Sequence, residues 1–173
     1  MFLNAIKEIP AIIIHNMDLK IYNLTVYTDG ASRGNPGKSG AGIFIIDEDN
    51  KKNISLKQYL GILTNNEAEY RAFIIALEYL SKSKFTNGPE IFNILFLADS
   101  QLLINQINGI YSVKSPNIIP LYNKAKKLIE NLNAAYSFKH IPRTLNFKAD
   151  KLANSAIDYN VEKLDIDEQT SSC

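Results

Sequence analysis

A glycine-rich stretch beside an apolar segment constrains the fold of this chain most strongly. Residues 27–42, YTDGASRGNPGKSGAG, contain five glycines and one proline, and the preceding residues alternate between apolar and polar. Glycine and proline are poor helix formers, so the stretch interrupts regular structure. It is either a turn between two strands or a phosphate-binding loop that opens a helix.

The phosphate-loop interpretation has partial support in the sequence. Gly37, Lys38 and Ser39 match the end of the nucleotide-binding pattern GxxxxGK[ST], but Ser32 stands where the first glycine should be. The apolar run ILFLAD (94–99) ends in an aspartate, as magnesium-binding strands of such folds do. That loop needs a helix directly after its lysine, whereas small and β-branched residues follow here. The sequence therefore favours a hairpin turn.

The periodicity of the remaining chain predicts strands first and helices later. Asn65 or Asn66 is expected to cap the first helix, and Asn146 the last. Strands are predicted over 19–30, 41–50, 51–61, 91–99 and 134–141, and helices over 64–82, from 100 to about 108, and over 115–132 and 146–159. This order, βββαβααβα, is that of one mixed sheet with helices packed on it.

Length and composition fit one domain with short extensions. The chain has 173 residues, 46% of them hydrophobic, which is enough for a real core. We expect an N-terminal extension over 1–20, a domain over 21–159 and a flexible acidic tail over 160–173. Because Met17 lies just before the first strand, residues 1–16 are either an added strand or a result of start-site choice.

Charge and cysteine content limit the cellular setting. Residues 114–148 hold seven Lys or Arg against one acid, which fits either a solvated helix face or a polyanion contact. The only cysteine, Cys173, cannot form an intrachain disulfide, so we expect a reducing compartment, the cytoplasm. No apolar run approaches the ~20 residues of a membrane span, so we expect no membrane association.

Four acidic residues fall at the ends of predicted elements. Asp29 and Asp99 end strands, and Glu69 and Asp150 lie near the starts of helices. Each alone has an ordinary explanation, as a turn former, a helix cap or a charge that complements a helix dipole. Together they resemble a site for hard cations, because clustered carboxylates repel unless cations compensate. Two such ions ~3.5 to 4 Å apart stabilise both the attacking and the leaving oxygen in phosphodiester cleavage.

Four separated blocks carry a family resemblance. TDGASRGNPGKSGAG, TNNEAEYRA, ADSQLLINQI and HIPRTLNFKAD occur in the order found in type 1 ribonuclease H, so the chain resembles that family from about Leu24 to Asp158. The resemblance implies an α/β ribonuclease H-like fold with a five-stranded mixed sheet, three antiparallel strands then two parallel, and helices on both faces. It also implies an endonuclease that hydrolyses the RNA strand of RNA–DNA hybrids and leaves 5′-phosphate and 3′-hydroxyl ends.

The same resemblance implies roles for individual residues. The family's metal-binding carboxylates, which hold two Mg²⁺ ions with Mn²⁺ as a substitute, match Asp29, Glu69, Asp99 and Asp150. His140 matches a loop histidine that transfers a proton or helps product and metal leave, although without the family a polar strand-end residue is the simpler interpretation. Contacts to the hybrid are implied for Gly30, Ser32, Asn35, Thr64, Asn65, Asn66 and Gln101.

Some features depart from better-known members. The segment over 108–124 is short and carries only Lys114 and Lys124, where some relatives insert a basic protrusion, and no N-terminal hybrid-binding module is seen. Ile62 stands where some relatives have an arginine. We therefore expect a monomer with modest hybrid affinity and looser rejection of double-stranded RNA. An inactive hybrid-binding module stays open, as does a resolvase-like or integrase-like nuclease, which is not expected to carry GNPG and TNN.

Overall fold

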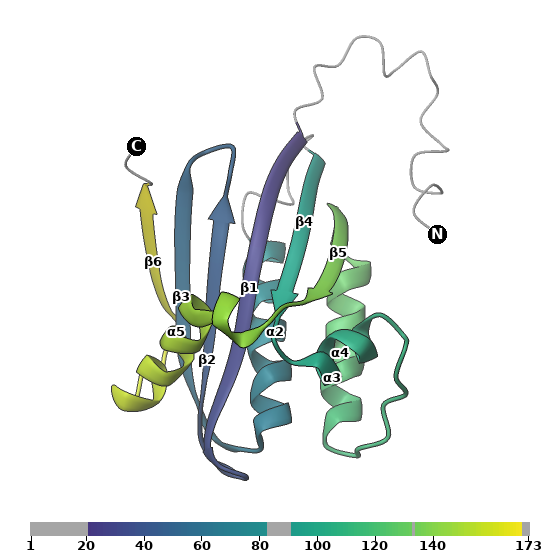
Figure 1. Ribbon diagram of the computed structural model, residues 1–173, viewed down its shortest axis with the longest axis vertical. Coiled ribbons are helices and arrows are strands. Elements are labelled where there is room, and N and C mark those ends of the chain that lie inside the picture. The colour runs from purple at the N-terminus through teal and green to yellow at the C-terminus, as the bar shows by residue number, and fades with distance from the viewer. Residues whose placement is uncertain (1–20, 83–90, 133, 171–173) are drawn as a thin grey trace.

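In the computed structural model, which describes residues 21–82, 91–132 and 134–170, a mixed sheet carries helices on both faces (Figure 1). The extension predicted over 1–20 lies outside the described residues. The strands are β1 (Ile21–Gly34), β2 (Gly37–Asp47), β3 (Lys52–Leu63), β4 (Ile91–Ala98), β5 (Ala134–His140) and β6 (Asp165–Thr170). The helices are α2 (Asn65–Lys82), α3 (Gln101–Ile107), α4 (Ile118–Glu130) and α5 (Phe147–Asp158), with a short 3₁₀ turn, η2 (Arg143–Leu145).

The strand order is β5-β4-β1-β2-β3-β6. β1, β4 and β5 run parallel to one another. On the other side of β1, each strand is antiparallel to its neighbour: β2 to β1, β3 to β2 and β6 to β3. The predicted α/β class and the arrangement of three antiparallel and two parallel strands are confirmed. In the register of the sheet, Thr28 of β1 is paired with Ala98 of β4, and Ala98 is paired with His140 of β5. Asp29 and Asp99, the residues that follow Thr28 and Ala98, therefore lie at the same end of the parallel strands.

The glycine-rich stretch forms the β1–β2 hairpin, as the sequence favoured. β1 continues to Gly34, so Asp29 lies inside the strand, opposite Gly42, and the prediction that it ends the strand is wrong. The hairpin closes through Gly34, whose φ of 110° favours glycine, and through a cis Asn35–Pro36 peptide bond. Lys38 continues into β2 rather than into a helix, which rules out the phosphate-loop interpretation.

Helix α2 begins with a capping box rather than with an asparagine cap. The Thr64 hydroxyl donates to Glu67 Oε2 (2.6 Å), the Thr64 N–H donates to the same oxygen (2.9 Å), and the Glu67 N–H donates back to Thr64 Oγ1 (3.3 Å). The prediction of Asn65 or Asn66 as the cap is therefore wrong, because the capping residue is Thr64, one position before Asn65. The pattern T-x-x-E was present in the sequence and is the signal that identifies this start.

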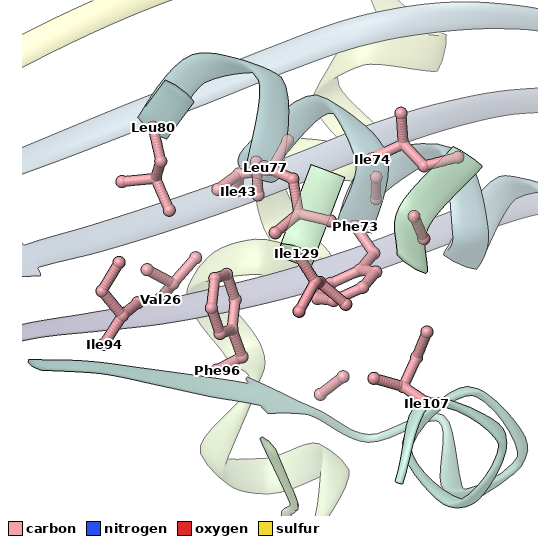
Figure 2. Close-up of a cluster of buried hydrophobic side chains, with 14 of the residues drawn as sticks. Val26, Ile43, Phe73, Ile74, Leu77, Leu80, Ile94, Phe96, Ile107 and Ile129 are labelled. Atoms are coloured by element: carbon pink, nitrogen blue, oxygen red, sulfur yellow. The ribbon is translucent and has the colours of Figure 1, made fainter. Parts of the chain in front are cut away.

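The main core lies between the sheet and helices α2, α3 and α4 (Figure 2). Phe73 of α2 packs edge-to-face against Phe96 of β4 with ring centroids 5.5 Å apart, and Phe96 stacks on Phe138 of β5 at 5.2 Å. Burying each such side chain contributes about 1.5–3 kcal/mol, so this core fixes α2 firmly against the strands. Of the helices described, none has the length and apolar character needed to cross a membrane.

The acidic tail was expected to be flexible, and the structure corrects this. Residues 165–170 form β6, which pairs antiparallel with β3, so the sheet has six strands instead of the predicted five. Complementary contacts explain the pairing: Lys57 Nζ lies 3.4 Å from Asp165 Oδ2, and the Tyr79 hydroxyl bonds Glu168 Oε1 at 3.1 Å. These partners are distant in sequence, so no local pattern indicated the strand.

We expect β6 to add modestly to stability. A chain ending at Leu164 should lose about 1–2 kcal/mol of unfolding free energy, because a few exposed cross-strand pairs contribute about 0.2–1 kcal/mol each. Urea unfolding of this chain, compared with a control ending at Thr170, measures the difference. Equal stability of the two chains would contradict a role for β6.

Candidate active site

Three buried or half-buried carboxylates meet at one end of the parallel strands. Asp29 of β1, Glu69 of α2 and Asp99 just after β4 each place a carboxylate oxygen within 4.8 Å of the others. Asp29 is 5% exposed and Glu69 is 6% exposed. The structure thus brings together three of the four acids that the sequence singled out, from elements that are far apart along the chain.

Two glycines let helix backbones come close enough to build this site. A Cβ added to Gly30 would lie 2.1 Å from the Glu69 backbone nitrogen, so α2 contacts the strand directly. On the opposite face, a Cβ added to Gly42 would lie 2.1 Å from the Ala149 carbonyl oxygen of α5. Because real Cβ atoms do not approach backbone atoms so closely, a side chain at either position would push a helix away from the sheet.

Burial and mutual repulsion perturb two of the acids. Burial, followed by the negative charges of Asp99 and Asp150, raises the pKa of Asp29 to about 7. Burial, followed by the charges of Asp29 and Asp99, raises the pKa of Glu69 well above its ordinary value. The Gly30 N–H donates to Glu69 Oε2 (3.3 Å) and partly opposes both shifts. These carboxylates are therefore held in a position that favours a compensating cation.

Asp150 lies near this group but has a protein partner of its own. Its Oδ1 accepts a hydrogen bond from Arg143 Nη2 at 2.6 Å, and its carbonyl accepts one from Asn154. The Arg143 charge also lowers the pKa of Asp29 and Glu69. Arg143 is a site residue that sequence reasoning missed, because a single arginine in a short loop carries no pattern that assigns it to a carboxylate.

Asn146 joins the two strands that carry Asp29 and Asp99. Its side chain is almost fully buried, at 1% exposure for the residue, and its Nδ2 donates to Asp99 Oδ1 (2.6 Å) and to the Thr28 carbonyl (2.9 Å). The predicted cap position of α5 is confirmed, but the side chain makes no capping bond. Asn146 Oδ1 is buried without a hydrogen-bond partner, an unusual state that points to a further donor such as water.

His140 lies at the rim of this site. It is the exposed last residue of β5, opposite Ala98 and therefore beside the point where the chain reaches Asp99. Gln101 is the exposed first residue of α3, two positions after Asp99. Both are placed at the same end of the sheet as the acids, and their predicted roles stay predictions.

Most residues predicted to contact a hybrid gather where the β1–β2 hairpin meets the start of α2. Asn35 Oδ1 accepts the Asn65 N–H at 3.1 Å, and the Ser32 hydroxyl is hydrogen-bonded to the Gly34 and Leu63 carbonyl oxygens. Thr64 forms the capping box, and Asn66 is exposed in the first turn of α2. The Gly30 N–H already donates a hydrogen bond to Glu69, so a contact between Gly30 and the hybrid would have to share that donor.

The donor set fits a hard divalent cation. All three clustered side chains offer oxygen atoms, which are the preferred ligands of Mg²⁺ and Mn²⁺. Among the described residues, the ion pairs involve Asp150 but none of Asp29, Glu69 and Asp99. Three acids gathered without a paired lysine or arginine are therefore best explained by a metal site.

The family model described as reverse transcriptase-like matches residues 27–156. A ribonuclease HI of Halobacterium salinarum is 36% identical over 132 residues, which cover 76% of this chain and 63% of that protein. A bifunctional protein of Mycobacterium tuberculosis is 35% identical over 136 residues, which cover 78% of this chain and 35% of that protein. The chain thus spans less than two thirds of either relative.

A solved structure agrees in fold and sequence. The crystal structure of LC11 ribonuclease H1 in complex with an RNA/DNA hybrid matches with a TM-score of 0.71 and 36% identity, and the match covers 79% of this chain and 98% of that one. This agreement confirms the assignment of the fold.

The raised pKa of Asp29 makes stability depend on pH. The folded protein binds more protons than the unfolded chain between about pH 4 and pH 7, so without metal its unfolding free energy falls as pH rises through this window. Asp29→Asn removes the buried charge and should raise the unfolding free energy at pH 8 by on the order of 2 kcal/mol, with little change at pH 4. Urea unfolding in EDTA at both pH values measures this.

Glu130→Gln, which changes an exposed acid at the end of α4, is the control and should not alter the pH dependence. An Asp29→Asn protein that gains no stability at pH 8 relative to pH 4 would show that the buried charge is not the cause.

Asn146 should tune metal affinity. Asn146→Ala frees Asp99 and leaves the Thr28 carbonyl without its donor, so we expect the Mg²⁺ dissociation constant to rise by about tenfold or more. Titration calorimetry measures it, with Asn123→Ala on the exposed face of α4 as the control. Unchanged Mg²⁺ affinity in a folded Asn146→Ala protein would contradict the positioning role.

Proposed function

The chain belongs to the type 1 ribonuclease H family, and we propose that it is an endonuclease that hydrolyses the RNA strand of RNA–DNA hybrids. The observation that carries the proposal is the meeting of Asp29, Glu69 and Asp99 at one end of the sheet. A similar chain, LC11 ribonuclease H1, was solved with an RNA/DNA hybrid, which supports a hybrid as the substrate.

The chain's own residues would prepare the site for divalent cations. We propose two Mg²⁺ ions, with Mn²⁺ as a substitute, held by Asp29, Glu69, Asp99 and Asp150. When bound, such ions make water a better nucleophile and stabilise the charge that develops on a phosphate. The Gly30 N–H orients one oxygen of Glu69, and Asn146 holds Oδ1 of Asp99, which leaves the other oxygen of each carboxylate for a ligand.

The products follow from the bond that breaks. Water attacks the scissile phosphorus, and the bond between phosphorus and the 3′ oxygen breaks. The phosphate stays on the 5′ end of the downstream fragment, and the upstream fragment keeps a 3′-hydroxyl. His140, exposed at the rim, is suited to donate the proton that the leaving 3′ oxygen needs or to assist departure of the product.

Recognition of RNA would use the polar groups at the hairpin and the start of α2. Asn35, Asn65 and Asn66 carry amides that both donate and accept hydrogen bonds, as recognition of a 2′-hydroxyl requires. Their mutual bonding, Asn65 N–H to Asn35 Oδ1, fixes the distance between the two segments. Ser32, Thr64 and Gln101 would add sugar and phosphate contacts.

The wider setting is part of the same proposal. The short α3–α4 connection offers few cations, and Lys124 of α4 is ion-paired with Glu78 of α2 at 2.7 Å, so few phosphate contacts are available there. We infer modest hybrid affinity, double-stranded RNA as a further candidate substrate, a monomeric enzyme and a cytoplasmic location.

Cleavage of a hybrid with a labelled RNA strand tests the proposal. With Mg²⁺ or Mn²⁺ we expect fragments with 5′-phosphate ends, because the displaced group is the 3′ oxygen. Glu69→Gln should reduce the rate by on the order of a hundredfold or more, and EDTA should abolish it. Glu130→Gln, the matched change at an exposed acid, should cleave like the wild type.

Parallel reactions with double-stranded RNA and single strands define the substrate. Hybrid binding without cleavage by the wild-type chain would replace the nuclease proposal with an inactive binding module. Cleavage that survives both Glu69→Gln and EDTA would show that the acidic site is not responsible.

A further inference from the structure

An apolar groove lies beside the acidic site, on the face of the sheet that α5 covers only in part (Figure 1). Tyr27 of β1, Phe44 of β2 and Leu97 of β4 form its floor, and Leu145 of η2 and Phe147, the first residue of α5, form its wall. Its volume is about 420 Å³, which lies within the ~300–1,000 Å³ of small-molecule sites. The groove is therefore large enough for a small organic ligand or one unit of a polymer.

The wall of the groove presents large apolar side chains to solvent. Leu145 and Phe147 are each 60% exposed. The floor adds a half-buried aromatic ring, Tyr27, whose centroid lies 6.2 Å from that of Phe44. Exposed apolar and aromatic side chains gathered on one surface indicate a binding site, and aromatic rings are the groups on which nucleobases stack.

The charges around the groove are positive. Lys148 lines the groove, and its Nζ lies over the Phe44 ring, 4.1 Å from the centroid. Lys139 of β5 is paired with Leu97 in the register of the sheet, so its side chain lies on the same face. None of the described residues that line the groove is acidic. For this end of the cationic segment 114–148, a polyanion contact is therefore favoured over a solvated helix face.

The groove is continuous with the acidic site. Tyr27 precedes Asp29 by two residues on β1, so the two side chains lie on the same face of the sheet, and Leu97 precedes Asp99 by the same interval. Two residues of a strand span about 6.6 Å, and stacked nucleotides of one strand are ~3.4 Å apart. A strand whose phosphate lies at the acids therefore reaches the groove within one or two nucleotides.

We propose that this groove binds one unpaired nucleotide of the RNA strand, with the base against Phe147 and Leu145 and a phosphate beside Lys148. A base inside a duplex is paired and stacked on both faces, so only a base that lies outside the duplex can enter the groove. The choice of ligand rests on the proposed nuclease function, because the acids beside the groove would hold the neighbouring phosphate. The enzyme would accordingly prefer hybrids whose RNA strand runs on unpaired beyond the duplex.

A tryptophan placed in the wall reports on binding in the full chain. The protein has no tryptophan, so Phe147→Trp gives a single emission signal. In EDTA, we expect a short single-stranded oligoadenylate RNA to quench this emission, because a base stacks on the ring, and an abasic strand of equal length to leave it unchanged. Tyr159→Trp, at a position that is 78% exposed and outside the groove, is the matched control and should respond to neither strand.

Cleavage kinetics give a second readout. A blunt hybrid is compared with a hybrid of the same duplex whose RNA strand extends unpaired at both ends. We expect the KM of the extended hybrid to be about fivefold lower or more, which corresponds to the stacking of one base. The double change Leu145→Ser, Phe147→Ser should abolish this difference and leave cleavage of the blunt hybrid unchanged, since both side chains are largely exposed.

The two readouts separate this proposal from the nuclease proposal. Quenching by oligoadenylate without cleavage of either hybrid would support the groove and reject the nuclease. Cleavage of both hybrids with equal KM, and no quenching, would reject the groove alone. Quenching by the abasic strand to the same extent would also overturn the proposal, because the contact would then be to phosphate only. A Phe147→Trp emission that shifts with protein concentration, together with dimers in sedimentation, would assign the groove to a second copy of the chain instead.

Discussion

The geometry of this protein depends on two close approaches of helix backbone to strand backbone. Because Gly30 has no side chain, α2 can lie close to one face of the sheet, and Gly42 in the same way lets α5 lie close to the other. Asp29, the neighbour of Gly30, pairs directly with Gly42, so both approaches occur at one point of the sheet. Glu69 on α2 and Asp150 on α5 reach the same neighbourhood for this reason. Moving either helix outward by the width of a methyl group would separate the acids.

The buried acids of the site lower the unfolding free energy of the fold. Burying Asp29 and Glu69 beside Asp99 raises their pKa, which means that each charge costs free energy in the folded state. The aromatic and aliphatic core on the α2 side offsets this cost, because Phe73 and its neighbours anchor the helix that carries Glu69. The protein thus keeps an unfavourable group of charges beside a helix that the core anchors, as expected of a functional site.

The sequence predicted the parts of the structure that are local or that follow from strand ends. The glycines and the β-branched run after Lys38 indicated a hairpin, and the four separated acids indicated a metal site, although Asp29 lies inside β1 rather than at its end. The sequence did not reveal contacts between distant segments. β6 depends on an ion pair with β3 and a hydrogen bond from α2, and the roles of Arg143 and Asn146 depend on how the β5–α5 connection folds over two strands. Only the capping box at Thr64 was a local signal that was overlooked.

The acids of the site are not equivalent, and the difference lies in what holds them. Asp29, Glu69 and Asp99 lie on β1, on α2 and directly after β4, and the last is fixed by Asn146 to the β1 backbone. Asp150 instead is bonded to Arg143, whose side chain is 76% exposed in the short η2 turn. A guanidinium that exposed can move away at little cost, so Asp150 can exchange its partner when cations or a phosphate backbone arrive. His140, the last residue of β5, lies directly before the same connection. The site therefore consists of three acids held by the sheet and by α2, and of one acid on α5 whose partner lies in an exposed turn.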